Sequence, residues 1–282
     1  MKIIDAHMHF SDVRKFYDAA DDSGVEYSYE GYMKEQKACG IVGSICMGIA
    51  ESTADAFPDK GAPLHMLADL DTRHPTNMKV CLGINPHRID KDYIAAARGM
   101  IAQEDGIVGF KIYAGYYHYH IHDKIYDQVY RLAAEYDLPV AIHTGDTYAE
   151  EALLEYAHPL NADRLAVRNR DVNFVLCHMG DPWIMDACEV AYKNRNVHVD
   201  ISGLLAGDAK LVSDTEGRTV VMNHYKQGIT YLNNYKKVLF GTDWPLVPLK
   251  AYIDFCKKLM PQSVYEDVFY GNAVRLYKLD IA

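Results

Sequence analysis

The chain has 282 residues, of which 49% are hydrophobic and 24% charged, an ordinary balance for a globular protein with a large buried core. Its formal net charge is −10 and Lys and Arg form no clusters, which argues against nucleic acids and anionic membranes as partners. No apolar stretch is long enough to cross a bilayer, and the six cysteines form no CxxC pair. We therefore expect a cytoplasmic protein that has no signal peptide and keeps its thiols reduced.

Eight short apolar runs recur along the chain and predict β-strands. They are rich in Val and Ile and are bounded by Gly, Pro, Asn or Asp. Their nearly continuous apolarity is typical of parallel strands that are covered on both faces. In chain order the runs are Lys2–Phe10, Ile41–Ala50, Met78–Asn85, Ile107–Tyr113, Leu138–Thr144, Val172–Met179, Asn196–Ser202 and Lys237–Thr242.

Helical patterns separate these runs. Predicted helices include Tyr29–Cys39, which Gly40 is expected to cap, Tyr93–Ile101, Trp183–Tyr192, and a helix whose apolar face is Ile125, Val129, Leu132 and Ala133. Eight strands alternating with helices predict an α/β fold, a single closed (β/α)8 TIM barrel over residues 1–282 with a terminal helix. An open doubly wound sheet is the competing fold, but no glycine-rich nucleotide fingerprint follows the first strand.

Three connections are long, and each follows the C-terminal end of a predicted strand. They are Glu51–Asn77 after the second strand, Ala114–His122 after the fourth and Gly203–Tyr235 after the seventh. In a barrel these segments lie at the mouth, where substrate loops belong, and we expect the first and the last to contain a helix each. The middle one is rich in Tyr and His, which favours a substrate wall, the alternative being a packed surface loop.

Polar side chains end several of the predicted strands. His7 and His9 end the first strand two positions apart, so their side chains share a face about 6.6 Å apart and can chelate one ion. His143 ends the fifth strand, His178 the sixth and Asp243 the eighth. In a barrel all these ends converge on one mouth. Three imidazoles and a carboxylate suit Zn²⁺, Fe²⁺ or Mn²⁺, and a chance placement of all five is the weaker explanation.

The same pattern resembles a known superfamily. Ile4–His9, His143, His178 and Gly241–Pro245 are similar to motifs of the amidohydrolase superfamily. The resemblance is to its amidohydrolase-2 branch, whose members include metal-dependent hydrolases and non-oxidative decarboxylases related to aminocarboxymuconate-semialdehyde decarboxylase. The segments Gly109–Ile112 and Gly271–Leu276 also resemble that branch, so the resemblance covers essentially the whole chain.

The resemblance implies one divalent ion, for which we expect zinc with manganese or iron as alternatives, bound by His7, His9, His143 and Asp243. His178 would stand beside the substrate, as a carbonyl-polarising or proton-transferring group; the alternatives are a further metal ligand or a core histidine. Asp243 can both contact the ion and accept a proton. Other superfamily branches hold a second metal through a carbamylated lysine on the fourth strand, which makes Lys111 a less favoured bridging ligand.

Four further residues are candidates for substrate binding. Lys111 is expected to bind a substrate carboxylate or to pair with Asp5 or Asp200, and either acid could instead orient a metal-binding imidazole. Tyr113 has the same strand parity as Lys111, where related sequences often show histidine. His87 follows the third strand and is expected to face the mouth. Trp244, directly after Asp243, either walls the pocket or packs beneath the last helix.

These features predict a metal-dependent hydrolase. It would act on an amide, ester or lactone bond of a small polar, carboxylate-bearing substrate through a metal-activated water. The alternatives are a lyase that decarboxylates an aromatic or unsaturated acid on the same metal, and a barrel that binds metal or a small molecule without turnover. The expected partner is the small-molecule substrate alone, with a homodimer as the default assembly.

Overall fold

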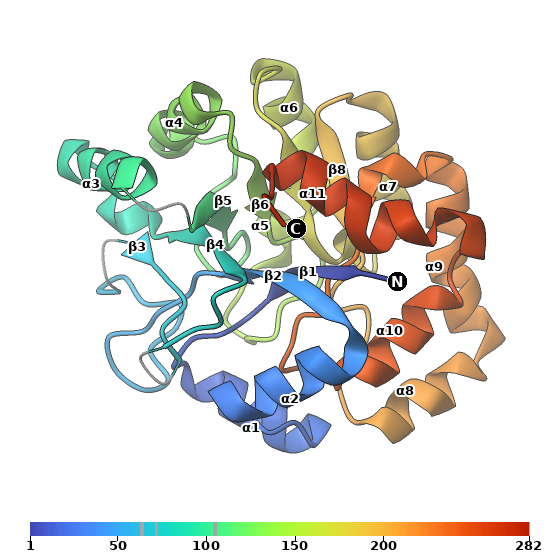
Figure 1. The fold of residues 1–282 in the computed structure, drawn as a ribbon. Coiled ribbons are helices and arrows are strands. Elements are labelled where there is room, and N and C mark those ends of the chain that lie inside the picture. Colours follow the sequence, from blue (N-terminus) through green and yellow to red (C-terminus); the bar gives the residue numbers. More distant parts are fainter. Residues whose placement is uncertain (63–64, 71–72, 104–105, 282) are drawn as a thin grey trace.

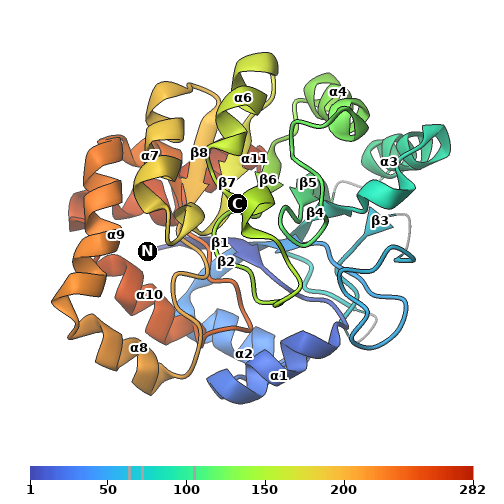
Figure 2. The same cartoon turned by 180° about the vertical axis from the view of Figure 1, so that it is seen from behind.

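The computed structural model describes residues 1–62, 65–70, 73–103 and 106–281. Within them, eight parallel strands follow one another around a nearly closed barrel, and a short ninth strand, β3 (His65–Met66), pairs antiparallel with β4. Helices surround the barrel on the outside (Figures 1 and 2). The barrel strands are β1 (Ile3–Met8), β2 (Ile41–Met47), β4 (Met78–Ile84), β5 (Ile107–Ile112), β6 (Val140–Ile142), β7 (Phe174–Leu176), β8 (Val197–Asp200) and β9 (Val238–Leu239).

The predicted TIM barrel is therefore confirmed, and each of the eight apolar runs contains a strand. The strands are shorter than the runs, because the residues at the mouth leave the extended conformation. After β7, for example, His178 and Met179 adopt left-handed backbone angles, with φ of 60° and 46°. At such positions the direction of the side chain is determined by a turn and not by the alternation of side chains along a strand.

Hydrogen bonds between the two ends of the sheet close the barrel. The amide of Ala6 donates to the carbonyl of Phe240 at 2.9 Å. The carbonyl of His7 accepts from both Thr242 and Asp243, at 3.0 and 2.8 Å. The backbone of two predicted metal ligands, His7 and Asp243, is thus joined directly.

The outer helices agree with the sequence pattern. Gly40 caps α2 with a φ of 72°, a left-handed conformation that glycine adopts without strain. The helix bounds are α1 (Arg14–Ser23), α2 (Tyr29–Cys39), α3 (Lys91–Gln103), α4 (Asp127–Tyr136), α5 (Leu154–Ala157), α6 (Asn161–Arg168), α7 (Ile184–Lys193), α8 (Ala209–Glu216), α9 (Thr219–Leu232), α10 (Leu249–Lys257) and α11 (Asn272–Tyr277). No helix in the described part of the chain combines the length and apolarity needed to span a membrane.

The long connections differ in content. The segment after β8 contains α8 and α9, so a helix was correctly expected there. The expectation of a helix in Glu51–Asn77 is wrong for residues 51–62, 65–70 and 73–77, which hold β3 and turns but no α-helix. Pro58 has no amide to donate within a helix, and the carboxylate of Asp59 instead accepts from the amides of Ser52 and Gly61, at 2.6 and 2.7 Å.

The inside of the barrel has its own apolar core. Side chains from successive strands, including Ile4, Ile45 and Val175, pack there with Ala273 and Tyr277 of the terminal helix. In Figure 1, α11 lies across one end of the barrel. The end of the barrel where the strands begin is therefore plugged, which leaves the C-terminal ends of the strands as the open mouth.

Candidate metal centre and active site

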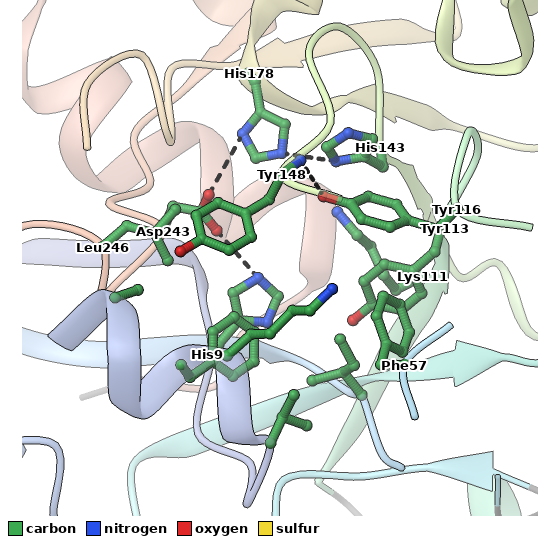
Figure 3. A pocket seen from close by; sticks show the side chains of 15 residues that line it. His9, Phe57, Lys111, Tyr113, Tyr116, His143, Tyr148, His178, Asp243 and Leu246 are labelled. Atoms are coloured by element: carbon green, nitrogen blue, oxygen red, sulfur yellow. Dashed lines mark hydrogen bonds and ion pairs between the residues drawn. The ribbon is translucent and has the colours of Figure 1, made fainter. Parts of the chain in front are cut away.

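The ends of four barrel strands bring the five predicted residues together. His7 is the penultimate residue of β1 and His9 follows that strand, His143 follows β6, His178 follows β7 and Asp243 lies beyond β9. All five side chains are buried. Figure 3 shows His9, His143, His178 and Asp243 gathered at the base of one cavity. The convergence that the sequence predicted is thus present in the fold.

Asp243 lies at the centre of this group. Its Oδ1 is 3.3 Å from His7 Nε2 and 3.1 Å from His9 Nε2, and its Oδ2 is 3.9 Å from His178 Nδ1. Burial by itself raises the pKa of Asp243, but the imidazoles that face it, those of His7 and His9 among them, lower it well below its usual value. One oxygen therefore faces the paired imidazoles of β1 and the other faces His178.

Hydrogen bonds fix which nitrogen of His7 and His9 carries a lone pair. His7 Nδ1 lies 2.9 Å from the carboxylate of Asp200, and His9 Nδ1 lies 3.3 Å from the carbonyl of Met47. Both partners only accept, so each Nδ1 donates, and in the neutral ring each Nε2 then turns a lone pair toward Asp243. His7 Nε2 and Asp243 Oδ1 are buried without a hydrogen-bond partner among the described residues. Lone pairs that converge in this way leave room for a cation between them.

His143 and His178 meet in a similar way. His143 Nε2 donates to the carbonyl of Asp146 at 2.9 Å, and His178 Nδ1 donates to the carbonyl of Ser202 at 3.1 Å. The remaining nitrogens, His143 Nδ1 and His178 Nε2, then face each other at 3.1 Å with lone pairs on both. Burial lowers the pKa of His178 to about 4 and that of His143 well below its usual value, so both rings are neutral. The residues present therefore fit a divalent metal with nitrogen and oxygen ligands.

A carboxylate behind the site orients the first imidazole. Asp200, at the end of β8, holds His7 through Oδ2, while its Oδ1 accepts from the amide of His178 at 2.9 Å and from the hydroxyl of Ser202 at 2.5 Å. The sequence offered Asp200 either this role or a pairing with Lys111, and the structure shows the first. Asp5, the other acid considered, accepts from the amide and hydroxyl of Thr242 at 2.9 and 2.6 Å.

Gly203 makes room for this arrangement. Its φ is 58°, in the left-handed region. A Cβ at this position would lie 2.7 Å from Asp243 Oδ2 and 2.8 Å from His178 Nδ1. No side chain can therefore stand here without moving the two residues that face each other beside it.

The cavity above the five residues has a volume of about 80 Å³. One part of its wall is apolar and is made of Val13, Phe16, Ala19, Ile49, Phe57 and Leu246. The polar part holds two lysines and three tyrosines, namely Lys15, Lys111, Tyr113, Tyr116 and Tyr148. The cavity therefore suits a small molecule with an apolar body and an anionic group.

Two of the predicted substrate-binding residues line this cavity. Lys111 is almost wholly buried, and its Nζ donates to Cys177 Sγ at 3.1 Å. Among the described residues no carboxylate forms an ion pair with it, so the remaining N–H groups of the ammonium are available to an anion. The hydroxyl of Tyr113 donates to the carbonyl of Gly48 at 2.7 Å, which fixes its ring against the wall.

The other two lie outside the cavity lining. Trp244 is fully buried against α2, where its ring lies 4.8 Å from that of Tyr32 and its Nε1 donates to Glu35 at 3.4 Å. Trp244 therefore neither walls the pocket nor packs beneath the last helix, because its ring packs against α2 instead. His87 lies in a neighbouring cavity beside Tyr119, with 3.5 Å between His87 Nδ1 and the tyrosine hydroxyl.

Several lining residues had no sequence signal. Lys15 and Phe16 reach the cavity from α1, and the ring of Phe16 stacks on His9 with 4.5 Å between centroids. Ser202 could have been found, because it follows Asp200 with the same strand parity at the end of β8. Its hydroxyl lies 3.1 Å from His7 Nδ1 and 3.0 Å from His178 Nδ1.

A family model described as Amidohydrolase matches residues 4–279 of the sequence. The chain belongs to the amidohydrolase family. Members of this family are metal-dependent enzymes, hydrolases and decarboxylases among them, so the chain is a metal-dependent enzyme and the resemblance seen in the sequence is confirmed. A comparison with curated protein sequences finds no match.

Solved structures with the same fold cover nearly the whole chain. An uncharacterised TIM-barrel protein from Bordetella bronchiseptica is 20% identical with a TM-score of 0.71, covering 99% of both chains. A dihydroxybenzoic acid decarboxylase from a Polaromonas species, with bound manganese and the inhibitor 2-nitroresorcinol, is 14% identical with a TM-score of 0.67, covering 100% of this chain and 98% of its own. A probable 2-pyrone-4,6-dicarboxylic acid hydrolase from Acinetobacter baumannii, with bound citric acid, is 14% identical with a TM-score of 0.62, covering 99% and 100%.

Proposed function

We propose that this enzyme hydrolyses an amide, ester or lactone bond of a small carboxylate-bearing substrate. The observation that carries the proposal is the position of Asp243, whose Oδ1 faces His7 and His9 while its Oδ2 faces His178. A carboxylate placed in this way can help to hold a cation with one oxygen and exchange a proton with the other. Hydrolysis requires that exchange twice, once for water and once for the leaving group.

The metal is proposed to lie among His7, His9, His143 and Asp243. When bound, the ion supplies Lewis acidity, which polarises a carbonyl oxygen and makes water easier to deprotonate near neutral pH. We propose zinc, because three imidazoles and one carboxylate suit it, with manganese or iron as the alternatives. Manganese is the metal bound in the Polaromonas decarboxylase.

The protein's own residues divide the remaining work. Asp243 Oδ2 accepts the proton of the attacking water and returns it to the leaving group. His178, neutral because it is buried, is proposed to stand beside the substrate carbonyl and help to orient it. Lys111 holds the substrate carboxylate through the N–H groups that Cys177 leaves free, and the ring of Tyr113 forms the adjacent wall. The apolar wall excludes water around the reacting bond.

Decarboxylation of an aromatic or unsaturated acid is the second candidate. The apolar side of the cavity favours it, because Phe16, Phe57 and Leu246 would accommodate an unsaturated ring beside the lysine that holds its carboxylate. A dihydroxybenzoate decarboxylase and a pyrone dicarboxylate hydrolase both share the fold, so the comparisons support carboxylate substrates in either case. Asp243 or His178 would then donate the proton to carbon.

One experiment separates the two reactions. The zinc- or manganese-loaded enzyme is incubated with a panel of carboxylated lactones, amides and hydroxybenzoates, and acid release and CO₂ release are measured separately. Hydrolysis predicts acid or amine release without CO₂. Release of CO₂ together with the decarboxylated product, without any acid or amine from hydrolysis, would contradict hydrolysis and support decarboxylation.

The assigned roles are tested by two variants. Asp243→Asn is expected to lower turnover by about 10²- to 10⁴-fold, as for loss of a general acid–base group, and to weaken metal binding. Asp163→Asn, on the outer helix α6, removes the same charge and should leave turnover unchanged. His178→Ala should keep the metal by elemental analysis and lose turnover; loss of the ion would instead identify His178 as a ligand.

A further inference from the structure

A second cavity, of about 290 Å³, lies beside the reaction cavity. Its lining includes Lys60, His87, Tyr117, Tyr119 and Glu151. None of the five metal-site residues lines it. Tyr116 lines both cavities, so its ring lies at the boundary between them.

Three features form this boundary. Besides Tyr116, the consecutive residues Phe57 and Pro58 stand on opposite sides, the first lining the reaction cavity and the second its neighbour. The third is an ion pair across the boundary, 3.7 Å between Lys15 Nζ of the reaction cavity and Glu151 Oε1 of the neighbouring one. At Tyr116, which lines both cavities, the wall between them is one side chain thick.

The ring of Tyr116 is held in place from several sides. It meets the ring of His143 edge-on with 5.0 Å between centroids, and the ring of Phe57 lies 5.4 Å away. Its hydroxyl accepts from the backbone amide of Tyr148 at 3.0 Å. Figure 3 shows the ring of Tyr116 beside His143, next to the loop that carries Tyr148. A ring fixed by these contacts acts as a wall and not as a freely rotating side chain.

The size of the reaction cavity gives this wall a consequence. A volume of about 80 Å³ corresponds to several water molecules, since one water needs about 10–15 Å³ of such space. We propose that Tyr116 is a specificity-determining residue, whose ring closes the reaction cavity against its neighbour and restricts the substrate to a single compact ring or a chain of similar size. This inference rests on the proposed function in one respect, which is that the reacting bond of the substrate lies beside Asp243.

Removal of the ring should join the cavities. Phenol and 4-phenylphenol serve as probes, because neither carries a carboxylate or a scissile bond and their binding reports the shape of the cavity whether or not the proposed reaction is right. Affinities are measured by ligand-observed NMR on the metal-loaded protein. We expect Tyr116→Ala to bind 4-phenylphenol at least about tenfold more tightly than the unmodified protein, since the added ring becomes buried. Tyr116→Phe keeps the ring and should behave as the unmodified protein.

A second substitution locates the gain. Lys60→Trp fills the neighbouring cavity from its rim, so adding it to Tyr116→Ala should abolish the gain for 4-phenylphenol. Tyr116→Leu provides the same comparison if the alanine variant does not fold, as judged by circular dichroism. Equal affinity of the unmodified and shortened proteins for 4-phenylphenol would overturn the proposal, and so would a gain that survives Lys60→Trp. If the enzyme turns over none of the carboxylated lactones, amides and hydroxybenzoates but Tyr116→Ala does bind 4-phenylphenol more tightly, the proposed reaction is refuted. The proposal that Tyr116 separates the two cavities is then still supported.

Discussion

Replacing Asp200 by Asn tests how the first metal-binding imidazole is held. Asp200 is buried behind the site, accepts from His7 Nδ1 at 2.9 Å through Oδ2 and from the amide of His178 at 2.9 Å through Oδ1. Burial alone raises its pKa, but the neighbouring His7 lowers it well below the usual range, so Asp200 is ionised at neutral pH. Both oxygens are needed as acceptors at the same time.

An asparagine has one acceptor oxygen in place of two. If that oxygen stays with the amide of His178, the NH₂ group faces His7 Nδ1, which must then accept. The proton of His7 moves to Nε2, and the lone pair directed at Asp243 is lost. Loss of such an orienting partner weakens metal binding by about 10- to 100-fold, or about 1.4–2.7 kcal/mol. We expect this range for Asp200→Asn.

The measurement is a chelator-competition titration of zinc or manganese into the metal-free protein. Asp12→Asn is the matched control, because it removes an exposed carboxylate that accepts only from Tyr17 among the described hydrogen bonds, and its affinity should equal that of the unmodified protein. Circular dichroism confirms that each variant is folded. A folded Asp200→Asn protein with unchanged metal affinity would refute the argument that this carboxylate selects the tautomer of His7.

Three further outcomes follow from the structure. Lys111→Met should raise the KM of a carboxylate substrate at least about tenfold while that of a neutral ester is unaffected, and an unchanged KM would rule out its proposed role. The same substitution should not lower the Tm, because the buried ammonium has no carboxylate partner among the described residues. Gly203→Ala should destabilise the fold by about 1–2 kcal/mol, because a residue with a Cβ is strained at a φ of 58°. It should also weaken metal binding, because the added Cβ displaces Asp243. Equal thermal unfolding curves for the variant and the unmodified protein would contradict the steric argument. Burial, with Lys237 adding to it, lowers the pKa of His198 to about 4. His198 therefore binds a proton near pH 6.5 in the unfolded chain but only near pH 4 in the folded chain, so the stability of the fold should fall as the pH drops from about 6.5 to about 4. His198→Gln should make the Tm less dependent on pH in this range. Parallel plots of Tm against pH for the variant and the unmodified protein would contradict this.

The barrel and the site were predictable for the same physical reason. A parallel barrel places every C-terminal strand end at one mouth, so His7, His143, His178 and Asp243 needed only to be recognised as strand ends. No contact between them had to be known. The role of each as a ligand or proton carrier stays a prediction, because it depends on a metal and a substrate.

Residues beyond the strand ends were less predictable. Trp244 follows a metal-site residue, yet the left-handed backbone of Asp243, with a φ of 66°, directs the Trp244 ring outward against α2. His87 sits in a short helical turn, where strand parity no longer applies. Lys15 and Phe16 reach the cavity because α1 folds over the mouth, and no local pattern in the sequence records where a helix comes to lie. Tertiary placement decides each of these cases.

The bonds that close the barrel also determine when the site can exist. Thr242 donates to Asp5, 237 positions earlier in the sequence, and the carbonyl of His7 accepts from the amide of Asp243, which is also synthesised late. During synthesis on the ribosome the first two imidazoles emerge long before the carboxylate that completes their surroundings. A nascent chain therefore lacks a complete metal site, and metal binding at this site requires that nearly the whole polypeptide has been synthesised.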